Sequence, residues 1–457
     1  MKLIPIYHWQ GNRVFASSKK ISNYPWFKGI LLLSCVVIAM LLANLPWTHQ
    51  LYHDLLHTQL TIHVQSPGDT VNVMFPRDMT VEKFINDILM VIFFFTVGLE
   101  IKREIAYGEL SSRKKAMLPV IAAFGGVVMP ALIFTLVNHG QPGASGWGIP
   151  TATDIAFAIC ILTALGDRVP TSLKVFLTAL AIVDDLIAIL VVALFYGGTI
   201  NLWLVIAAIV MTFIGVMMRK LNIKSMFPYI VVAIIIWILF YYGGIHATMS
   251  GVVMAFVIPS KPLFNREETL SRLHDAEEGF HYYDGLVDDI GFPSGPQRHY
   301  LRAMRKAVNG SMNMSYILER ALNPWVNYLI MPLFALANAG VYLGGGAGLG
   351  AVAAGIMLGL IIGKPLGITL FSWIAIKLGI GEKPEGASWL MFLAVACLGG
   401  IGFTMSIFVD TLSFSDQVPA VTEALRSEGK IAVLLGSVCA AIIGTIFISI
   451  VGKIKKK

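Results

Sequence analysis

The stretch LTALAIVDDLIAILVVALF, residues 177–195, places two neighbouring acids, Asp184 and Asp185, in the middle of an otherwise apolar run. A run of this length can cross a bilayer as an α-helix. An ionised carboxylate at the centre of a membrane costs several kcal/mol, roughly 2.5 to 3.5 on insertion scales, and two adjacent charges also repel each other. We therefore expect a bound cation, a proton or a basic side chain to neutralise the pair.

The composition of the whole chain is that of a membrane protein. Of its 457 residues, 56% are hydrophobic and only 13% are charged, whereas a soluble domain carries roughly 25% charge. The mean hydropathy is +0.74. Because backbone groups in lipid must be hydrogen-bonded internally, the recurring apolar stretches predict an all-α polytopic membrane protein.

The apolar stretches predict about twelve transmembrane helices. They are expected at residues 28–46, 84–99, 116–137, 150–166, 172–196, 202–219, 227–243, 246–260, 324–342, 350–374, 387–410 and 430–452. Lys and Arg gather in alternate loops, such as 102–115 and 219–224, while the loops 138–149 and 197–201 contain none. By the positive-inside rule, both termini should be cytoplasmic.

These spans divide the chain into five parts. They are a cytoplasmic tail (1–27), transmembrane helices 1–8 (28–260), a cytoplasmic insert (261–323), transmembrane helices 9–12 (324–452) and a basic cytoplasmic tail (453–457). Residues 60–75 alternate around a turn at 66–69, which predicts a small external β-hairpin. A lone hairpin is marginally stable, so we expect it to pack on the membrane domain or on a second copy in a homodimer. A flexible loop is the alternative.

The insert contains a long loop, residues 261–310, whose first part is acidic and whose second part is basic from Arg298 to Lys306. Residues 297–308 can form a basic amphipathic helix that lies on the membrane surface. The sequence alone favours the other interpretation, a solvated and variable insert.

Two predicted spans contain residues that interrupt a helix. The stretch GIPTATDIAFAICILTALG, residues 148–166, carries Pro150, Thr153 and Asp154, and the stretch LGGIGFTMS, residues 398–406, carries three glycines. Interrupted membrane helices expose backbone carbonyls that can ligate a hard cation. Two interruptions at matching places in the two halves are typical of inverted-topology repeats with crossing helices and a site at the midplane.

Lys364 lies in the middle of the predicted span 350–374, next to Pro365. A lysine at this depth must pair with an acid, lose its proton or reach water, so it is the expected counter-charge for one of the two aspartates. Snorkelling to the interface is the alternative, which the mid-span position disfavours. Pro365 removes one helical hydrogen bond and can loosen the helix.

Other ionisable residues lie near the ends of spans. Asp87 begins the second span, and Glu100 and Glu104 share one helical face at its cytoplasmic end. Such a cluster is either solvated or senses pH and attracts cations. His246 lies at an external helix start. A hydrogen-bonded structural role is the ordinary interpretation, and a pH-sensing role stays open.

Nothing in the sequence indicates an enzyme, a cofactor or a nucleic-acid partner. The four cysteines lie in apolar stretches without CxxC spacing and are expected in the core. No phosphate-binding loop, nucleophile elbow, HExxH or dinucleotide motif occurs in a supporting context. The net charge of +7 comes from basic residues in short loops, where they set topology.

Seven stretches together resemble the NhaA-type sodium/proton antiporter family. They are NDILMVIFFFTVGLEIKRE (86–104), TATDIAFA (151–158), LAIVDDLIAI (180–189), GIHATMSGV (244–252), PLFALANAGV (332–341), IIGKPLGITLF (361–371) and GIGFTMSIF (400–408). The resemblance runs from about residue 28 to residue 452 and is broken by the loop 261–310. Members of this family have inverted repeats, so the resemblance and the repeat pattern are not independent.

The resemblance implies a role for each matching residue. Asp185 would be the main Na⁺ or Li⁺ ligand and a proton carrier, and Asp184 would be its partner, bound to Lys364 in one state. Thr153 and Asp154 would lie where the two interrupted helices cross. There, Asp154 and Lys364 would balance the helix-end dipoles.

The same resemblance assigns the charges near the helix ends. Glu100 and Glu104 would belong to a pH-response region, and Asp87 would match a charged position near the external end of the second span. Residues 318–325 read LERALNPW, where the family carries histidines. Glu319 keeps an acidic position there. We therefore expect a pH set point that differs from the family's.

Residues and resemblance together predict an electrogenic, pH-regulated secondary transporter that exchanges cytoplasmic Na⁺ or Li⁺ for external H⁺ by alternating access. Its partners would be these ions, the lipid bilayer and a second copy of the chain, and its location the inner membrane of a bacterium. The alternative is a Na⁺-coupled symporter of an organic anion, which should lack the Lys364 chemistry and have a larger polar cavity. A channel or a structural membrane scaffold is a third class.

Overall fold

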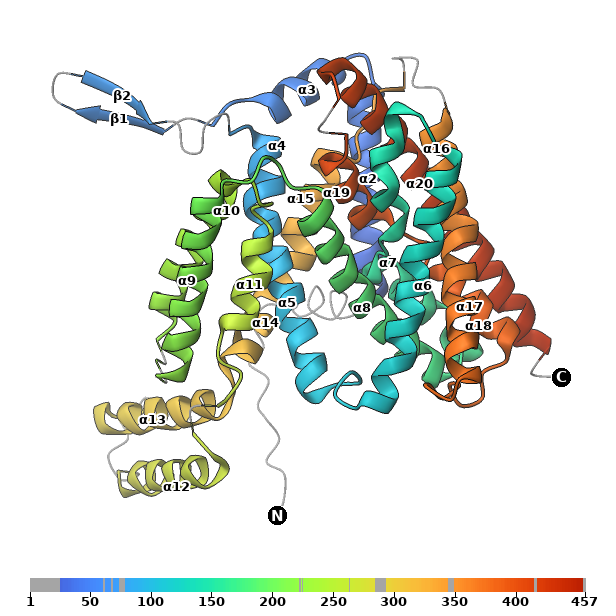
Figure 1. Ribbon diagram of the computed structural model, residues 1–457. Coiled ribbons are helices and arrows are strands. Elements are labelled where there is room, and N and C mark those ends of the chain that lie inside the picture. Colours follow the sequence, from blue (N-terminus) through green and yellow to red (C-terminus); the bar gives the residue numbers. More distant parts are fainter. Residues whose placement is uncertain are drawn as a thin grey trace. The chain divides into compact units, whose positions relative to one another are not determined.

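The computed structural model describes residues 25–60, 62–66, 69–73, 79–221, 223, 225–262, 264–283, 293–343, 349–414 and 417–454. Most of the predicted N-terminal tail, 1–27, lies outside them. The chain forms two compact units, and Figure 1 shows their helices and the two strands. The first contains Met1–Met90, Glu104–Gly197 and Asn327–Lys457, and the second contains Val91–Arg103 and Gly198–Val326.

The first unit contains both interrupted helices. Its helices are α2 (Pro25–Asn44), α3 (His49–His57), α4 (Val81–Phe84), η1 (Ile85–Leu89), α6 (Arg113–Val137), η2 (Pro142–Thr151), α7 (Ile155–Ala164), η3 (Gly166–Arg168), α8 (Thr171–Phe195), α15 (Met331–Asn338), α16 (Ala351–Leu358), η7 (Gly359–Gly363), α17 (Lys364–Lys377), α18 (Trp389–Leu398), α19 (Phe403–Leu412) and α20 (Pro419–Ile454). Helices α6 and α17 touch backbone to backbone, because a Cβ on Gly367 would lie 2.1 Å from the carbonyl oxygen of Gly125. This close packing fixes the start of α17, where Lys364 lies.

The second unit is a bundle of helices with a helical hairpin attached. Its helices are α9 (Leu202–Lys220), α10 (Met226–Gly243), α11 (Met249–Val257), α12 (Arg266–Tyr282), α13 (Gly295–Ser311) and α14 (Met314–Trp325). Helices α5 (Met90–Tyr107) and η5 (Val326–Ile330) cross the boundaries between the units. The bundle has its own apolar core, which includes Leu99, Tyr229, Ile236 and Ala255.

Among the described residues, eight helices are long and apolar enough to cross a membrane. They are Trp26–Asn44, Val81–Tyr107, Lys115–Val137, Thr171–Phe195, Leu202–Lys220, Met226–Gly243, Ala351–Lys377 and Ala420–Gly452. The pairs η2–α7 and α18–α19 are bent by 43° and 51°, and counting each as one span gives ten. The predicted twelve are therefore not confirmed. The predicted span 246–260 holds only the nine-residue α11, and 324–342 falls on short consecutive helices.

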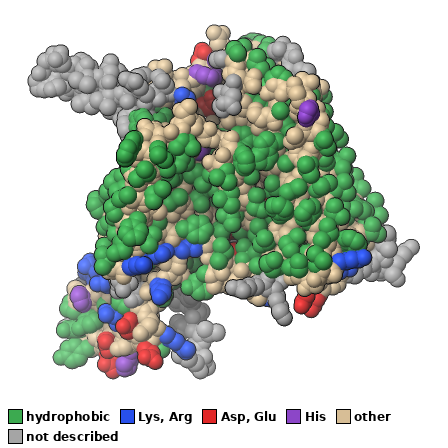
Figure 2. All heavy atoms as spheres, in the orientation of Figure 1, with side chains coloured by type: hydrophobic (Ala, Val, Ile, Leu, Met, Phe, Trp, Pro, Cys, Tyr) green, Lys and Arg blue, Asp and Glu red, His purple; other side chains and the backbone are tan. Residues whose placement is uncertain are grey.

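Large apolar side chains cover the outside of these helices. Figure 2 shows them over most of the visible face. On α9, Trp203, Ile209 and Phe213 have exposed fractions of 81%, 63% and 62%. Such extensive apolar exposure is unstable in water and is ordinary against lipid tails. The chain is therefore built as a multi-pass membrane protein.

One two-stranded sheet accompanies the helices in the described residues. Strand β1 (Ile62–Ser66) pairs antiparallel with β2 (Asp69–Val73), so that Ser66 faces Asp69 at the turn. This is the ladder that the alternating pattern of residues 60–75 predicts. Its placement outside the membrane and its role in a homodimer stay predictions.

Candidate functional site

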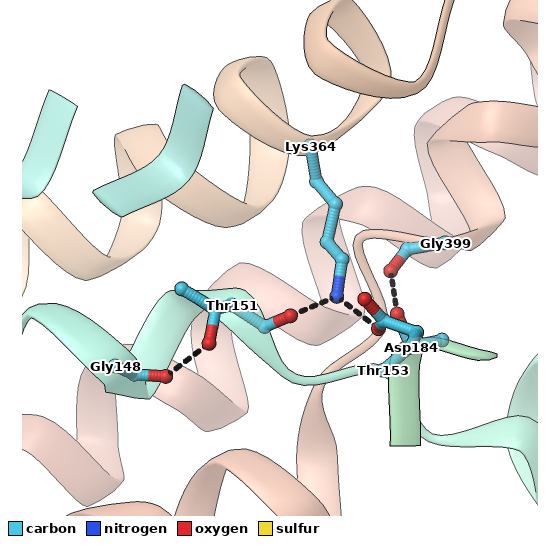
Figure 3. Close-up of polar contacts among 6 residues, drawn as sticks. All are labelled: Gly148, Thr151, Thr153, Asp184, Lys364 and Gly399. Carbon is cyan, nitrogen blue, oxygen red and sulfur yellow. Dashed lines mark hydrogen bonds and ion pairs between the residues drawn. The ribbon is translucent and has the colours of Figure 1, made fainter. Parts of the chain in front are cut away.

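A buried ion pair joins helices α8 and α17. The Nζ atom of Lys364 donates to Oδ2 of Asp184 at 2.6 Å and to the carbonyl oxygen of Thr151 at 2.5 Å (Figure 3). The side chains of Lys364 and Asp184 have exposed fractions of 0% and 1%. Neither partner reaches water, so each depends on the other for its charge balance.

Lys364 lies at a junction between a π-helical turn and a regular α-helix. A π-helical turn, η7, precedes Lys364, and Pro365 follows it at the start of α17. Proline lacks the N–H that a regular helix needs, and a π-turn accommodates such a missing bond. The predicted loosening of the helix thus takes the form of a local π-turn, and Lys364 emerges directly after it.

Asp185, the neighbour of Asp184 on α8, is also buried, with an exposed fraction of 3%. Successive residues of a helix point about 100° apart, so the two carboxylates do not share one face. Lys364 donates to Asp184 and still lies within electrostatic range of Asp185. The site therefore combines two acids and one base inside the membrane-spanning part of the fold.

The two bent spans cross beside this ion pair and are hydrogen-bonded to each other. The hydroxyl of Thr153 donates to the carbonyl oxygen of Gly399 at 2.8 Å. The backbone N–H of Asp154 donates to the carbonyl oxygen of Ile401 at 2.6 Å. A Cβ on Gly400 would lie 2.3 Å from the carbonyl oxygen of Leu360 in η7, so the break in the second bent span needs a glycine to pack against η7. The bends also carry strain, since Phe403 has a φ of 23°.

The carboxylate of Asp154 caps two helices at once. Its Oδ1 accepts from the backbone N–H groups of Ala156 and Phe157, at 3.1 and 3.3 Å, at the start of α7. Its Oδ2 accepts from the backbone N–H of Thr404, at 3.2 Å, and from the Thr404 hydroxyl, at the start of α19. One negative charge thus faces two positive helix ends, while Lys364 faces the carbonyl end of η2.

These contacts make the crossing a place where a small cation can bind. It presents carboxylates, hydroxyls and backbone carbonyls, which are the oxygen ligands that hard cations prefer. The Oδ1 atom of Asp184 and the hydroxyl of Ser406 are buried and have no hydrogen-bond partner in the described part of the chain. Both oxygens are available for an ion or a water molecule.

The second unit brings two of the predicted pH-response residues together around Arg103. Its guanidinium donates to Glu319 of α14 and lies 3.8 Å from Glu100. Nearby, Lys102 donates to the carbonyl oxygens of Ala255 and Phe256, at 3.1 and 3.2 Å, at the end of α11. Arg103 thus links α5 to α14 through Glu319, while Glu100 lies on α5 itself.

The structure places the remaining predicted residues in other elements of the chain. Glu104 accepts from the backbone N–H of Glu109 at 3.2 Å. His246 lies between α10 and α11, where its Nδ1 is 3.3 Å from the hydroxyl of Thr248. Asp87 lies in η1. Glu104 and His246 thus contact residues that lie close to them in the sequence.

One buried acid was not predicted from the sequence. Asp410 of α19 is 0% exposed, and neither of its carboxylate oxygens has a hydrogen-bond partner among the described residues. The charges that act on it are Lys430 and Arg426 of α20. Asp410 is the last residue of the predicted span 387–410. An acid at the end of a span is ordinarily solvated, so its position gave no reason to expect it to be buried. Arg426, just before the next predicted span, and Lys430, its first residue, were the signal that could have identified it.

The comparisons with known proteins agree with this architecture. Residues 19–448 match the family described as Na⁺/H⁺ antiporter 1. The Na⁺/H⁺ antiporter NhaA of Wolinella succinogenes is 41% identical over 434 residues, which cover 94% of this chain and 92% of the relative. The Na⁺/H⁺ antiporter NhaA of Helicobacter pylori is 40% identical over 445 residues, which cover 97% of each chain. The chain therefore belongs to the Na⁺/H⁺ antiporter 1 family, as its seven sequence motifs imply.

Proposed function

We propose that this protein exchanges Na⁺ or Li⁺ for protons across a membrane, and that Asp184, Asp185 and Lys364 carry the exchanged ions. The observation that supports the proposal most strongly is the buried Lys364–Asp184 pair, with Asp185 beside it, at the crossing of two bent helices. The names of the relatives point to the same ions.

Charge balance indicates how the exchange works. Paired Lys364 and Asp184 are neutral together, so an ionised Asp185 leaves one negative charge in a place where charge is costly. A proton or a Na⁺ ion on Asp185 removes that charge. The two ions therefore compete for the same carboxylate, and binding of one expels the other.

Lys364 decides whether exchange moves net charge. If Na⁺ replaces only the proton of Asp185, one positive charge leaves for each that enters. If Na⁺ also draws Asp184 away from Lys364, the lysine loses its partner, and burial then favours its neutral form. Two protons then leave for one Na⁺. We propose this second route, which makes transport electrogenic and lets a membrane potential drive Na⁺ out.

Alternating access requires the crossing to move relative to the rest of the protein. The hydrogen bonds from Thr153 and Asp154 tie the two bends to each other. We expect the bends to move as one body, because separating them would leave buried backbone groups unpaired. Glu100 and Glu319 hold Arg103 elsewhere in the chain, and this charge cluster is the proposed basis of pH regulation.

We place the protein in a bacterial inner membrane with both termini in the cytoplasm, following the distribution of Lys and Arg in its loops. No cofactor is needed, since the exchanged ions supply the driving force. The hairpin β1–β2 is the proposed dimer contact. A Na⁺-coupled symporter remains the second candidate class and is separated by the test below.

The test is Na⁺-driven proton release in proteoliposomes, followed with a pH-sensitive dye. Asp185→Asn should abolish the signal for both Na⁺ and Li⁺, because the amide carries no negative charge for the cation and neither takes up nor releases a proton. Asp54→Asn is the matched control, since Asp54 is exposed on α3. Exchange that survives in Asp185→Asn would exclude the assigned ligand. Uptake of an organic anion that needs Na⁺ and releases no protons would favour the symporter.

A further inference from the structure

Helices α12 and α13 form a hairpin with one closely packed interface. The ring of Tyr300 on α13 stacks on Tyr283, with centroids 6.1 Å apart. A Cβ on Gly279 of α12 would lie 2.1 Å from the Tyr300 ring. On α13, Ala307 is 1% exposed. The face of α13 that holds Tyr300 and Ala307 is therefore the face that packs on α12.

The opposite face of α13 is basic and exposed. Each residue turns a helix by about 100°, which places Arg298, Arg302 and Arg305 roughly 140 to 200° from Tyr300 around the axis. All three arginines are exposed. Arg298 donates to the carbonyl oxygen of Pro293 at 3.0 Å. Within the described residues, Arg302 and Arg305 have no hydrogen bond or ion pair. These three residues are called the arginine stripe below.

Acidic side chains occur on only one of the two helices, α12, which also carries Arg266 and Arg272. Helix α13 contains no acidic residue, whereas α12 exposes five: Glu267, Glu268, Asp275, Glu277 and Glu278. A simple solvated hairpin gains stability when acids and bases alternate and pair across its surface. Here the acids lie on one helix, and the arginine stripe lies on the far face of the other. This arrangement suits a hairpin with different surroundings on its two sides.

Hydrogen bonds hold α13 at one end of the second unit's apolar helices. The backbone N–H of Phe264 donates to the carbonyl oxygen of Gly310 at 3.0 Å, and Pro262 forms a bridge with Asn313, which begins α14. In Figure 1, α13 runs crosswise to α9, near one end of it, and α12 lies on the far side of α13. A helix held crosswise at the end of membrane-spanning helices is placed to lie along the bilayer surface. In that position the arginine stripe, which faces away from α12, would face the lipid.

We propose that the arginine stripe binds the phosphate groups of anionic phospholipids in the adjacent leaflet. A guanidinium matches a phosphate with two parallel hydrogen bonds and is more weakly hydrated than an ammonium group. Leu301 and Val308, each 41% exposed, flank the stripe and can enter the interfacial region. The inference concerns how the insert is anchored and does not depend on the exchange reaction.

Hydrogen–deuterium exchange of the full-length protein in nanodiscs tests this proposal. The readout is the protection of the α13 peptide in phosphatidylglycerol compared with phosphatidylcholine, since a ligand that binds the folded helix slows its opening. We expect stronger protection in phosphatidylglycerol. It should vanish in about 0.5 M choline chloride, where the Debye length falls to about 4 Å.

Variants identify the side chains responsible. Arg302→Gln/Arg305→Gln should weaken lipid binding roughly 25-fold, from about fivefold per arginine, and so remove most of the added protection. Arg302→Lys/Arg305→Lys should retain part of it. Lys261→Gln/Arg266→Gln removes two exposed charges of the same insert outside α13 and should retain all of it. Equal protection in the two lipids, or equal loss in both Gln variants, would overturn the proposal. Protection of α13 only after addition of a soluble protein fraction would overturn it in favour of a protein partner.

Discussion

Removal of one partner from the Lys364–Asp184 pair should destabilise the protein strongly. In Lys364→Met, the Asp184 carboxylate stays buried without the cation that lies 2.6 Å away in the native protein. Breaking a buried pair in this way costs roughly 3 to 5 kcal/mol, because a charge remains uncompensated in a medium of low dielectric. The same change also removes the hydrogen bond to the Thr151 carbonyl oxygen, worth about 1 kcal/mol.

A double-mutant cycle separates this charge effect from packing. Unfolding free energies would be measured by SDS titration in mixed micelles for Lys364→Met, Asp184→Asn and the double variant. The double variant should regain most of the loss, because neither side chain then carries a buried charge. Lys377→Met is the matched control: Lys377 lies on the same helix, is exposed and contacts the Trp373 ring. It should cost about 1 kcal/mol or less.

Two results would refute this reasoning. A loss below about 1 kcal/mol in Lys364→Met would mean that water or another cation compensates Asp184 in the folded protein. Additive losses in the double variant would mean that the two side chains do not interact, since contacting residues give coupling energies of roughly 0.5 to 3 kcal/mol.

Three further perturbations test other parts of the account. Asp154→Ala removes the caps of both α7 and α19 and should lower the unfolding free energy by about 1 to 4 kcal/mol, measured in the same titration; a loss as small as that of Asp54→Ala would contradict the double cap. Asp410→Asn should destabilise the end of α19, and Lys430→Met should recover part of that loss in the same background, because Lys430 and Arg426 otherwise face each other without their acid; no recovery would show that Asp410 and Lys430 do not interact. Lowering the pH by one unit in the acidic range should raise the apparent KM for Na⁺ about tenfold for each competing proton, because the ligand carboxylates must be deprotonated to bind the metal ion; a KM that does not change with pH would exclude competition at the site.

The charged residues of the site were predictable because ionisable side chains are rare and costly within apolar membrane spans. A lysine or an aspartate in the middle of an apolar stretch needs a partner wherever the fold places it, so Lys364 pointed to the Asp184–Asp185 pair before any geometry was known. Glycine, proline and threonine clusters predicted the two bends for a similar reason. The contacts between Asp154 and Thr404, 250 residues apart, depend on how the bends cross and have no local signal.

Other features depend on packing that a linear pattern does not contain. Twelve spans were predicted because residues 246–260 are apolar, yet α11 has nine helical residues, and its burial comes from neighbouring helices. Asp410 was not predicted to be buried, because the sequence does not show that α20 packs over it. The direction of the arginine stripe on α13 follows from which face Tyr300 packs on α12, which only the folded hairpin reveals.

The number of protons released per Na⁺ taken up tests the central claim most directly. Both fluxes would be measured in the same proteoliposomes, with radioactive Na⁺, a pH-sensitive dye and a membrane potential clamped by K⁺ and valinomycin. The account predicts two protons per Na⁺ for the native protein, and one for any Lys364→Met/Asp184→Asn protein that still exchanges ions, because only Asp185 can then carry a proton. An unchanged ratio in that variant would contradict the assignment of Lys364 as the second proton carrier.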